Sequence, residues 1–434
     1  MPKNIYLNQA TRIEGQARVH IEISDGRIEA ARLLVADFRG FEGFARGKQV
    51  EFVPGLVSRI CGLCSASHQI AALKAIEEAL GLTPEPSVTA LREIILLGEW
   101  ISSHALSYFF LTLPDLLGAP GGIFELRQRH PELAEKAFLL RRSGLKIVRL
   151  LAGRASHPIT LGIGGFLSEP EPQDLEEVVQ SADRVRAVVW DQLQNLQEAD
   201  VHPGRETLRF PEGQPLHFAA YSPNDDHFLV FDRQGRETDR FSREGFEEQV
   251  GEMQADWSLA KFPYLARYGF PAGIMIVGPL ARSFLPGGVL DDPELNSLPW
   301  VRSLGNLEIR HPEHIDFFRL LEIFRAAGQI RKLAETVEQH RLAILPIDPR
   351  GSGLGRGVVE APRGLLVHTC LVQEGRLEQL RLLVATQFNN PFINLLLRRI
   401  AEDHLQGEAL SSEGERLIGR CLRVFDPCLS CATH

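Results

Sequence analysis

Cysteine is scarce in this chain, with six residues among 434. A small secreted domain built on disulfides would be shorter and richer in cysteine, so the composition favours a reducing compartment, and we expect a cytoplasmic location. Basic residues are not in excess either: 47 Lys and Arg stand against 56 Asp and Glu, which gives a net charge of −9. Their scattered distribution argues against nucleic acid as a main partner.

Long hydrophobic runs are also missing. The two longest uncharged runs, 382–397 and 100–114, contain polar side chains and are shorter than the roughly 20 apolar residues that cross a bilayer. We therefore expect no membrane span, and we expect both runs to be buried core segments. Residues 1–5 show no apolar stretch of the kind that a secretory signal has.

The hydrophobic pattern predicts both helices and hairpins. Helical periodicity is found over 67–80, 88–113, 131–153, 172–198 and 313–342. Hairpins are predicted at 17–38 and 364–384, with a weaker one at 216–231. The expected fold is α+β and mainly α, with a central bundle of long helices and small β-hairpin layers contributed by the N- and C-terminal segments.

We expect one large domain over 1–434, since the chain is long enough to bury a large core. It would consist of an N-terminal hairpin and first CxxC (1–70), a helical bundle (71–345), and a C-terminal hairpin and second CxxC (346–434). Segments 203–226 and 285–298 are rich in turn residues, so we expect them to be surface excursions.

Four of the six cysteines form two CxxC pairs at opposite ends of the chain, Cys61 with Cys64 and Cys428 with Cys431. A CxxC pair can bind one metal ion, and two pairs could supply four sulfur ligands to one site. A zinc ribbon separates its pairs by roughly 15 to 20 residues, whereas here nearly the whole chain lies between them. Spacing alone therefore leaves a shared metal, separate sites, redox dithiols and unpaired buried thiols open.

The residues around the two pairs are more specific. Residues 59–68 fit the pattern RxCGxCxxxH, and residues 426–434 fit DPCxxCxxH. Together they resemble the two signature motifs of nickel-iron hydrogenase large subunits. Other segments similar to that family are TRIEG at 11–15, FRGFE at 38–42, SHAL at 103–106 and EAPRG at 360–364.

This resemblance implies a catalytic subunit that cleaves H2 reversibly and heterolytically into protons and electrons. In such a subunit Cys61 and Cys428 would be terminal nickel ligands, while Cys64 and Cys431 would bridge nickel to an iron that carries carbon monoxide and cyanide. Thiolates are soft donors that suit a redox-active metal, and metal binding keeps them deprotonated.

The resemblance also implies roles for three further side chains. Glu14 would carry the proton outward, Arg363 would place a guanidinium over the open site or the diatomic ligands, and His68 would donate a hydrogen bond toward a bridging sulfur. Each has a structural alternative. Glu14 could be a capping residue or pair with Arg12, Arg363 could belong to a structural ion pair, and His68 could be a core histidine.

A second metal ion is implied near the C-terminus. Glu42 and His434 resemble two ligands of a buried Mg2+ or Fe2+, with a backbone carbonyl from 386–390 as a third. His434 is the last residue, where the family's maturation protease cuts, so we expect either a processed chain or one encoded without a tail. Cys370 and Cys421 match no motif, and we expect buried structural thiols.

Two departures from the family pattern concern its branches. Gln16 stands where many relatives have His, and Ser103 stands where membrane-linked uptake enzymes have Asp. The SHAL segment is closer to the cytoplasmic branch that works with NAD, NADP, deazaflavin or heterodisulfide partners. With four cysteines committed, Cys370 and Cys421 cannot hold an iron-sulfur cluster, so an iron-sulfur small subunit is the expected partner, with a flavin or NAD(P) module as a further one.

Three alternatives compete with the hydrogenase hypothesis. The first is a hydrogen-sensing regulatory homologue, which turnover rate would distinguish from an enzyme. The second is a metal-free structural subunit related to the quinone module of respiratory complex I, and the retention of all four cysteines argues against it. The third is a zinc-stabilised binding protein, which leaves Glu14, Glu42 and Arg363 unexplained.

Overall fold

The computed structural model describes residues 3–7, 11–35, 38–196, 208–211, 213–305, 311–338 and 342–433.

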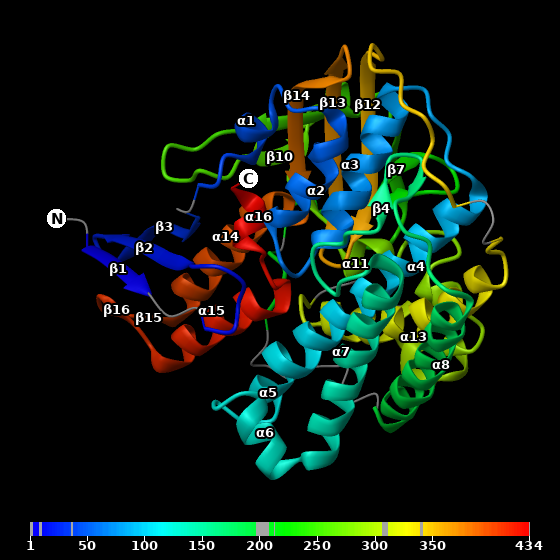
Figure 1. The fold of residues 1–434 in the computed structure, drawn as a ribbon. Coiled ribbons are helices and arrows are strands. Elements are labelled where there is room, and N and C mark those ends of the chain that lie inside the picture. The colour runs from blue at the N-terminus through cyan, green and yellow to red at the C-terminus, as the bar shows by residue number, and fades with distance from the viewer. Residues whose placement is uncertain are drawn as a thin grey trace.

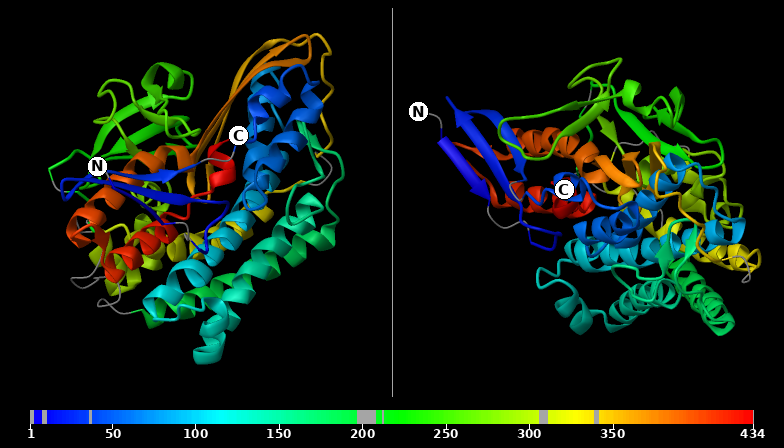
Figure 2. Two further views of the ribbon diagram at one scale, coloured as in Figure 1. Left: turned by 90° about the vertical axis from the view of Figure 1, so that its left-hand side faces the viewer. Right: turned by 45° about the horizontal axis from the view of Figure 1, so that its top comes forward.

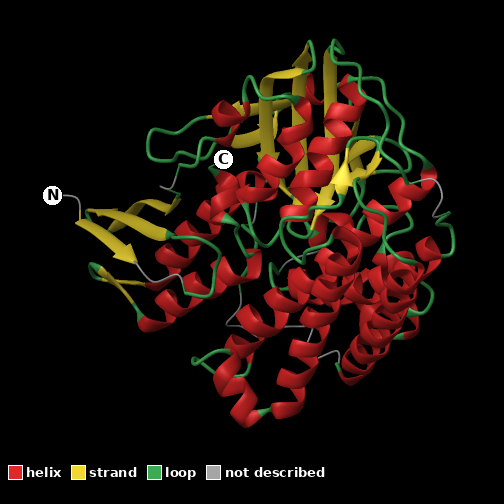
Figure 3. Cartoon of the chain, in the orientation of Figure 1, coloured by secondary structure: helices red, strands yellow, loops and turns green. Residues whose placement is uncertain are grey.

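Four long helices form the centre of the molecule. The four helices are α4 (Pro86–Ala105), α7 (Pro131–Ala152), α8 (Pro172–Asn195) and α13 (His314–Ala334). They pack on one another in the lower half of the view in Figure 1, while most strands lie above them or to one side (Figure 3). The predicted helical bundle is confirmed, although α13 ends at Ala334 rather than near residue 342.

Helices α4 and α7 approach each other closely because small residues lie where they cross. A Cβ atom on Gly144 would be 2.5 Å from the backbone nitrogen of Ser102. The stretch Pro86–Leu116 includes α4, a π-helical turn (Leu106–Thr112) and α5 (Leu113–Leu116), and it is long and apolar enough to cross a membrane by length and composition. In its apolar 18-residue window, 83% is buried inside the protein. The prediction of a buried core segment at 100–114 is confirmed.

Both predicted terminal hairpins are present, each within a three-stranded antiparallel sheet. The N-terminal sheet has the order β1 (Lys3–Leu7), β2 (Arg18–Ser24), β3 (Arg27–Leu34). The C-terminal sheet has the order β12 (Gly353–Ala361), β13 (Gly364–Gln373), β14 (Arg376–Val384). Strands β1 and β12 were not predicted.

The middle of the chain contains more strand than the sequence indicated. The weak hairpin at 216–231 is present as β6 (His217–Ser222) and β7 (His227–Phe231), and these strands belong to a four-stranded sheet with β8 (Glu237–Ser242) and β11 (Met275–Ile276). The smaller strands of this region are β4 (Leu161–Gly162), β5 (Gly165–Phe166), β9 (Val250–Met253) and β10 (Phe262–Leu265). Segment 71–345 is therefore more than a helical bundle.

The expectation that 203–226 and 285–298 are surface excursions is wrong in part. Strand β6 lies within the first segment and every one of its residues is buried, so it lacks the alternation that marks a half-exposed strand. Within 285–298, Val289 and Leu295 are buried in short helical turns. Residues 203–207 lie outside the described residues.

The C-terminal region also contains two helices that were not predicted. They are α14 (Ala385–His404) and α15 (Ser412–Phe425), and they lie beside the N-terminal sheet (Figure 1). The uncharged run 382–397 is buried as predicted for most of its length, but it is shared between the end of β14 and the first part of α14. Pro391 lies inside α14, which a sequence pattern alone would count against a helix.

Helix α3 (Ser65–Ala79) lies directly against the C-terminal sheet, as both views in Figure 2 show. Glycines alternate along β12 where the helix crosses it, and a Cβ atom on Gly357 would be only 1.7 Å from the carbonyl oxygen of Ala71. Cβ atoms on Gly355 and Gly353 would be 1.9 and 2.1 Å from the carbonyl oxygens of Ala75 and Ala79. The missing side chains thus fix the distance between the sheet and the helix that begins directly after Cys64.

Candidate metal centre

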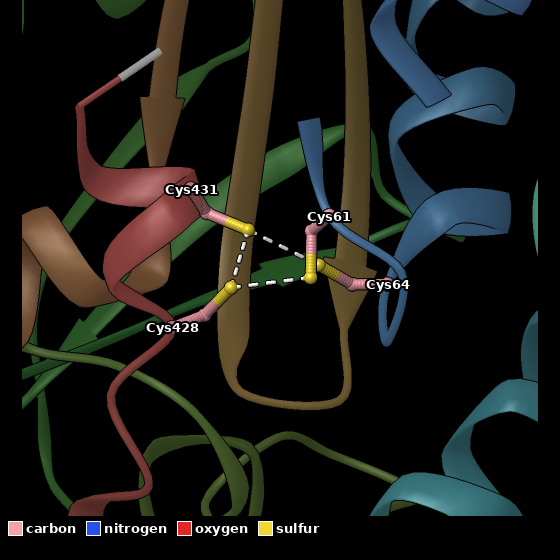
Figure 4. A group of neighbouring side chains, drawn as sticks. All are labelled: Cys61, Cys64, Cys428 and Cys431. Atoms are coloured by element: carbon pink, nitrogen blue, oxygen red, sulfur yellow. Dashed lines mark hydrogen bonds between the residues drawn. The ribbon is translucent and has the colours of Figure 1, made fainter. Parts of the chain in front are cut away.

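The four CxxC cysteines converge at one buried point (Figure 4). Cys61 and Cys64 lie in the loop before α3, and Cys428 and Cys431 lie at the start and on the first turn of α16 (Leu429–Ala432). Their sulfurs lie within 4.8 Å of one another, with 3.2 Å from Cys61 to Cys428 and 3.2 Å from Cys64 to Cys431. None forms a disulfide. The alternative of two separate metal sites, which the spacing of the motifs had left open, is therefore wrong.

The cluster fits a metal centre by donor type and spacing. Thiolate–metal bonds are about 2.3 Å long, so two sulfurs on one ion are at most about 4.6 Å apart, close to the spread seen here. Hydrogen bonds from the thiols of Cys428, Cys431 and Cys64 lower the pKa of Cys61, whereas burial raises the pKa of Cys428 and Cys431. Four thiolates packed in one buried place therefore need a cation to compensate their charge.

The N-terminal segment holds Glu14 beside the second CxxC. Glu14 and Cys428 form an isolated parallel bridge, and the Glu14 carboxylate accepts hydrogen bonds from the backbone N–H of Ser430 at 3.0 Å and from the Ser430 hydroxyl. Arg12 instead pairs with Asp115 and donates to the Leu111 carbonyl at 2.9 Å. The structural alternative of a Glu14–Arg12 pair is therefore not what the structure shows.

Arg363, in the turn between β12 and β13, brings a positive charge to the cluster. Its Nε donates to the Asp426 carbonyl at 2.7 Å, one terminal nitrogen pairs with the Asp426 carboxylate at 2.8 Å, and the other donates to the Ser103 hydroxyl at 3.3 Å. Burial alone would lower its pKa, but the Asp426 carboxylate and the nearby cysteines, Cys428 first, raise it well above the ordinary value. The guanidinium is thus held in one orientation and remains charged.

Asp426 is a site residue that the residue-by-residue assignment missed, although it stands in the DPCxxC motif itself. It has a left-handed backbone conformation (φ 47°) at the end of α15 and also accepts a hydrogen bond from Ser107 in the π-helical turn. A wider helical turn of this kind often occurs at functional sites.

His68 lies on the first turn of α3, next to Cys431. Its Nε2 is 3.5 Å from the Cys431 sulfur, and its Nδ1 is 3.1 Å from Nε2 of His368. His368 is fully buried on β13. Nothing in the sequence around His368 indicated a role, because only the packing of α3 on the sheet brings the two rings together.

The expected second metal site is described only in part. The Glu42 carboxylate accepts a hydrogen bond from the Leu382 backbone N–H at 2.8 Å, and the Arg39 N–H donates to the Thr433 carbonyl at 2.9 Å. The segment that carries Glu42 is therefore next to the C-terminal end of the chain. His434 lies outside the described residues.

A buried ion-pair network supports the turn that carries Arg363. Glu322 of α13 forms two hydrogen bonds of 2.7 Å with Arg282, which also donates to the carbonyls of Ala361 and Pro362, and His104 of α4 lies 2.8 Å from Glu322. Burial lowers the pKa of His104 to about 4. Although His104 stands in the SHAL segment, the sequence assigned no role to His104, Arg282 or Glu322, because ion pairing between distant segments leaves no local pattern.

Two remaining thiols and one carboxylate complete the description of the site. Cys370 and Cys421 are buried and belong to no cluster among the described residues, and burial raises the pKa of Cys370 to about 12. Glu99 of α4 accepts hydrogen bonds from the Ala66 and Ser67 N–H groups at 2.9 and 3.1 Å, at the N-terminus of α3. Glu99 matched no motif and was also missed.

Comparisons with known proteins agree with this geometry. A family model described as nickel-dependent hydrogenase matches residues 39–118 and 324–434, which include both CxxC pairs. The beta subunit of the NAD-reducing hydrogenase HoxS of Cupriavidus necator is 28% identical over 100% of this chain and 95% of the relative. The alpha subunit of sulfhydrogenase 2 of Pyrococcus furiosus is 29% identical over 99% and 98%.

The fold is also similar to a solved structure. A chain of an NAD+-reducing [NiFe]-hydrogenase in the H2-reduced state superposes with a TM-score of 0.86 and 27% identity, and the match covers 100% of this chain and 99% of the other. The likeness therefore extends over the whole chain and includes the mid-chain strands that the sequence did not predict.

Proposed function

The chain belongs to the nickel-dependent hydrogenases, and from this premise we propose that Cys61, Cys64, Cys428 and Cys431 hold its catalytic nickel-iron centre. The observation that carries this proposal is the convergence of the four buried sulfurs within 4.8 Å. When bound, the centre supplies the site at which H2 is cleaved heterolytically and reversibly into protons and electrons.

Glu14 is placed to move the proton away from the cluster. Its carboxylate is bonded to Ser430, which lies between Cys428 and Cys431 in the sequence, and its side chain is only partly buried. A proton released beside Ser430 can therefore be taken up by a Glu14 oxygen and passed toward solvent.

Arg363 and His68 act on the cluster without binding it. The Arg363 guanidinium, oriented by Asp426, offers a fixed positive charge beside the thiolates. The His68 ring, oriented by His368, can donate from Nε2 toward the Cys431 sulfur. Such hydrogen bonds tune the electron density of a sulfur ligand.

The finer composition of the site is part of the proposal. We assign carbon monoxide and cyanide to the iron, and a Mg2+ or Fe2+ ion to Glu42, His434 and a carbonyl of 386–390. Support for the second ion comes from the hydrogen bond between Arg39 and Thr433, which brings the Glu42 segment to the C-terminal end. The DPCxxCxxH and FRGFE segments fit this assignment.

Electrons are proposed to leave through an iron-sulfur small subunit, in a cytoplasmic complex that can also include a flavin or NAD(P) module. The relatives named above are subunits of hydrogenases, and this chain has only two cysteines outside the cluster, too few for a cluster with four thiolate ligands. Three phenylalanines between the N-terminal sheet and the first CxxC, Phe38, Phe44 and Phe52, are at least 60% exposed. Exposed aromatic groups of this kind favour a docking surface.

Metal analysis and infrared spectroscopy together test the proposal. The purified enzyme should contain nickel and iron and should show the absorption of metal-bound carbon monoxide and cyanide, at frequencies where protein is transparent. Cys428→Ser should lose the nickel and all H2 turnover, because one ligand of four is removed, whereas Cys370→Ser should retain both. Stoichiometric zinc in active protein, without these bands, would contradict the assignment.

A further inference from the structure

A small cavity lies on the side of the cysteine cluster formed by α4 and α7. Its volume is about 40 Å³, and its polar lining consists of Glu99, Ser102, Ser103 and Arg141. The backbone of Gly62, between Cys61 and Cys64, forms one wall. Gly62 is exposed and Arg141 is partly exposed, whereas Glu99, Ser102 and Ser103 are buried, so the cavity runs from the surface inward.

The three polar residues of α4 face this cavity together because of their spacing. Glu99, Ser102 and Ser103 stand at positions i, i+3 and i+4, which share one face of a helix. At the inner end, the Ser103 hydroxyl accepts a hydrogen bond from Arg363, the residue that approaches the cysteine thiols. The cavity is therefore connected to the candidate metal centre through a hydroxyl group and a guanidinium.

Four polar side chains around such a volume favour water as its occupant. A cavity needs about 10–15 Å³ to hold one water molecule, and the water needs two to four polar partners. This cavity exceeds the first requirement and meets the second. A purely apolar lining would have indicated a dry pocket instead.

We propose that Glu99 and the water held in this cavity form a second proton route between the metal centre and solvent, separate from Glu14. The inference rests on the proposed hydrogenase function. In the outward direction, a proton on cavity water passes to a carboxylate oxygen of Glu99 to form a neutral carboxylic acid. The acid then gives a proton to water on the Arg141 side and the carboxylate is regenerated, so no electron moves in this step.

The surroundings of Glu99 suit this exchange. It is 6% exposed and forms no ion pair with the other described residues. The charged or titratable groups on its side of the cluster are Arg141, which lines the cavity, Arg363, which donates to Ser103, and Cys61. Burial raises its pKa to about 7, against the hydrogen bonds from Ser67 and Ala66, which lower it. Both protonation states are thus available near neutral pH, as a relay requires.

The test compares isotope exchange in the assembled enzyme. Glu14→Gln, Glu99→Gln, the double variant and the control Glu93→Gln, an exposed carboxylate on the same helix, are assayed for exchange between H2 and D2O and for nickel content. Glu14→Gln and Glu99→Gln should each slow exchange at full nickel occupancy. The double variant should slow it by at least about tenfold more than Glu14→Gln alone. The control should match the wild type. A double variant no slower than Glu14→Gln would overturn the proposal.

A second variant separates proton transfer from the support that Glu99 gives to α3. Ala155→Leu adds apolar volume to the cavity while leaving the hydrogen bonds of Glu99 intact, and it should slow exchange with full nickel content in a Glu14→Gln background. If Glu99→Gln loses nickel while Ala155→Leu exchanges normally, Glu99 only holds the helix and the proposal fails. In infrared titrations of the wild-type enzyme, the absorption of a protonated carboxyl group should appear as the pH falls from 8 to 6. Glu99→Gln should lack this band. A wild-type enzyme without nickel would instead refute the hydrogenase assignment itself.

Discussion

At the residue scale, Arg363 joins the turn between β12 and β13 to two other parts of the site. It binds the backbone and the side chain of Asp426, directly before the second CxxC, and it reaches Ser103 on α4. Three separate nitrogens make these contacts. A lysine has a single nitrogen and cannot reproduce this planar arrangement.

Arg363→Lys should therefore retain nickel but lose H2 turnover by about 100-fold, because the remaining charge is misplaced relative to the reacting site. Turnover, nickel content and the infrared bands of the active site measure this effect. The matched control is Arg356→Lys on β12, the strand that leads into the turn of Arg363; Arg356 pairs with Glu247 away from the cluster. Equal losses in the two variants would indicate a general effect on β12 instead.

His104 makes a prediction about acid stability. Its folded pKa is about 4 because it is buried, whereas an unfolded histidine titrates near 6.5. The unfolded chain therefore binds a proton first as the pH falls, so this contribution to stability is complete above pH 6.5 and is lost progressively toward pH 4.

The loss over that interval should be on the order of 3 kcal/mol. His104→Gln, which retains a hydrogen-bond donor toward Glu322, should flatten the pH dependence of the free energy of unfolding between pH 6.5 and 4. Denaturant unfolding at a series of pH values measures the slope. An unchanged slope would mean that other groups dominate in this range.

At the scale of elements, the contact between α3 and β12 decides where the first CxxC lies. The alternating glycines of β12 leave room for the carbonyl oxygens of the helix. Because the helix begins directly after Cys64 and carries His68, a shift of the helix moves both residues relative to Arg363 and His368.

Gly357→Ala should move the helix or destabilise the protein by about 3 kcal/mol, since the new methyl group would overlap the Ala71 carbonyl oxygen. Gly55→Ala is the control, because Gly55 lies in the short helix α2 (Val53–Val57) with open space at its Cβ position. The temperature of thermal unfolding and the nickel content should both decrease in Gly357→Ala and remain unchanged in Gly55→Ala. Wild-type values for Gly357→Ala would show that the sheet can adapt.

At the scale of the whole molecule, both ends of the chain contribute cysteines to the cluster, and the proposed function requires a partner that receives electrons. The segment 38–52 exposes three phenylalanines just before the first CxxC. Exposed aromatic side chains in a contiguous segment are typical of a surface that another protein covers.

Phe44→Glu should therefore weaken association with the iron-sulfur subunit and lower the yield of the complex in co-purification, while leaving the nickel content of this chain unchanged. Leu167→Glu, at an exposed apolar residue outside this segment, is the matched control. If Phe44→Glu assembles as well as the control, the docking surface lies elsewhere.

The sequence by itself determined the chemistry of this protein and much of its helical framework. The cysteines of the two CxxC motifs and their flanking Arg and His residues are local patterns. Amphipathic periodicity marks helices such as α7 and α8 because burial of one face follows directly from residue order. The division into a single domain, the cytoplasmic location and the roles of the individual site residues, including Glu42 and His434, remain predictions.

Only the tertiary structure decided which residues surround the cluster. Asp426, His368, Glu99 and the network from His104 to Arg282 owe their positions to contacts between segments far apart in the chain. Strand β12 escaped prediction for the same reason, because only the helix that packs on it explains its alternating glycines. Long-range packing leaves no periodic signal in residue order, and so the positions of charges and protons around the sulfurs became visible only in the folded chain.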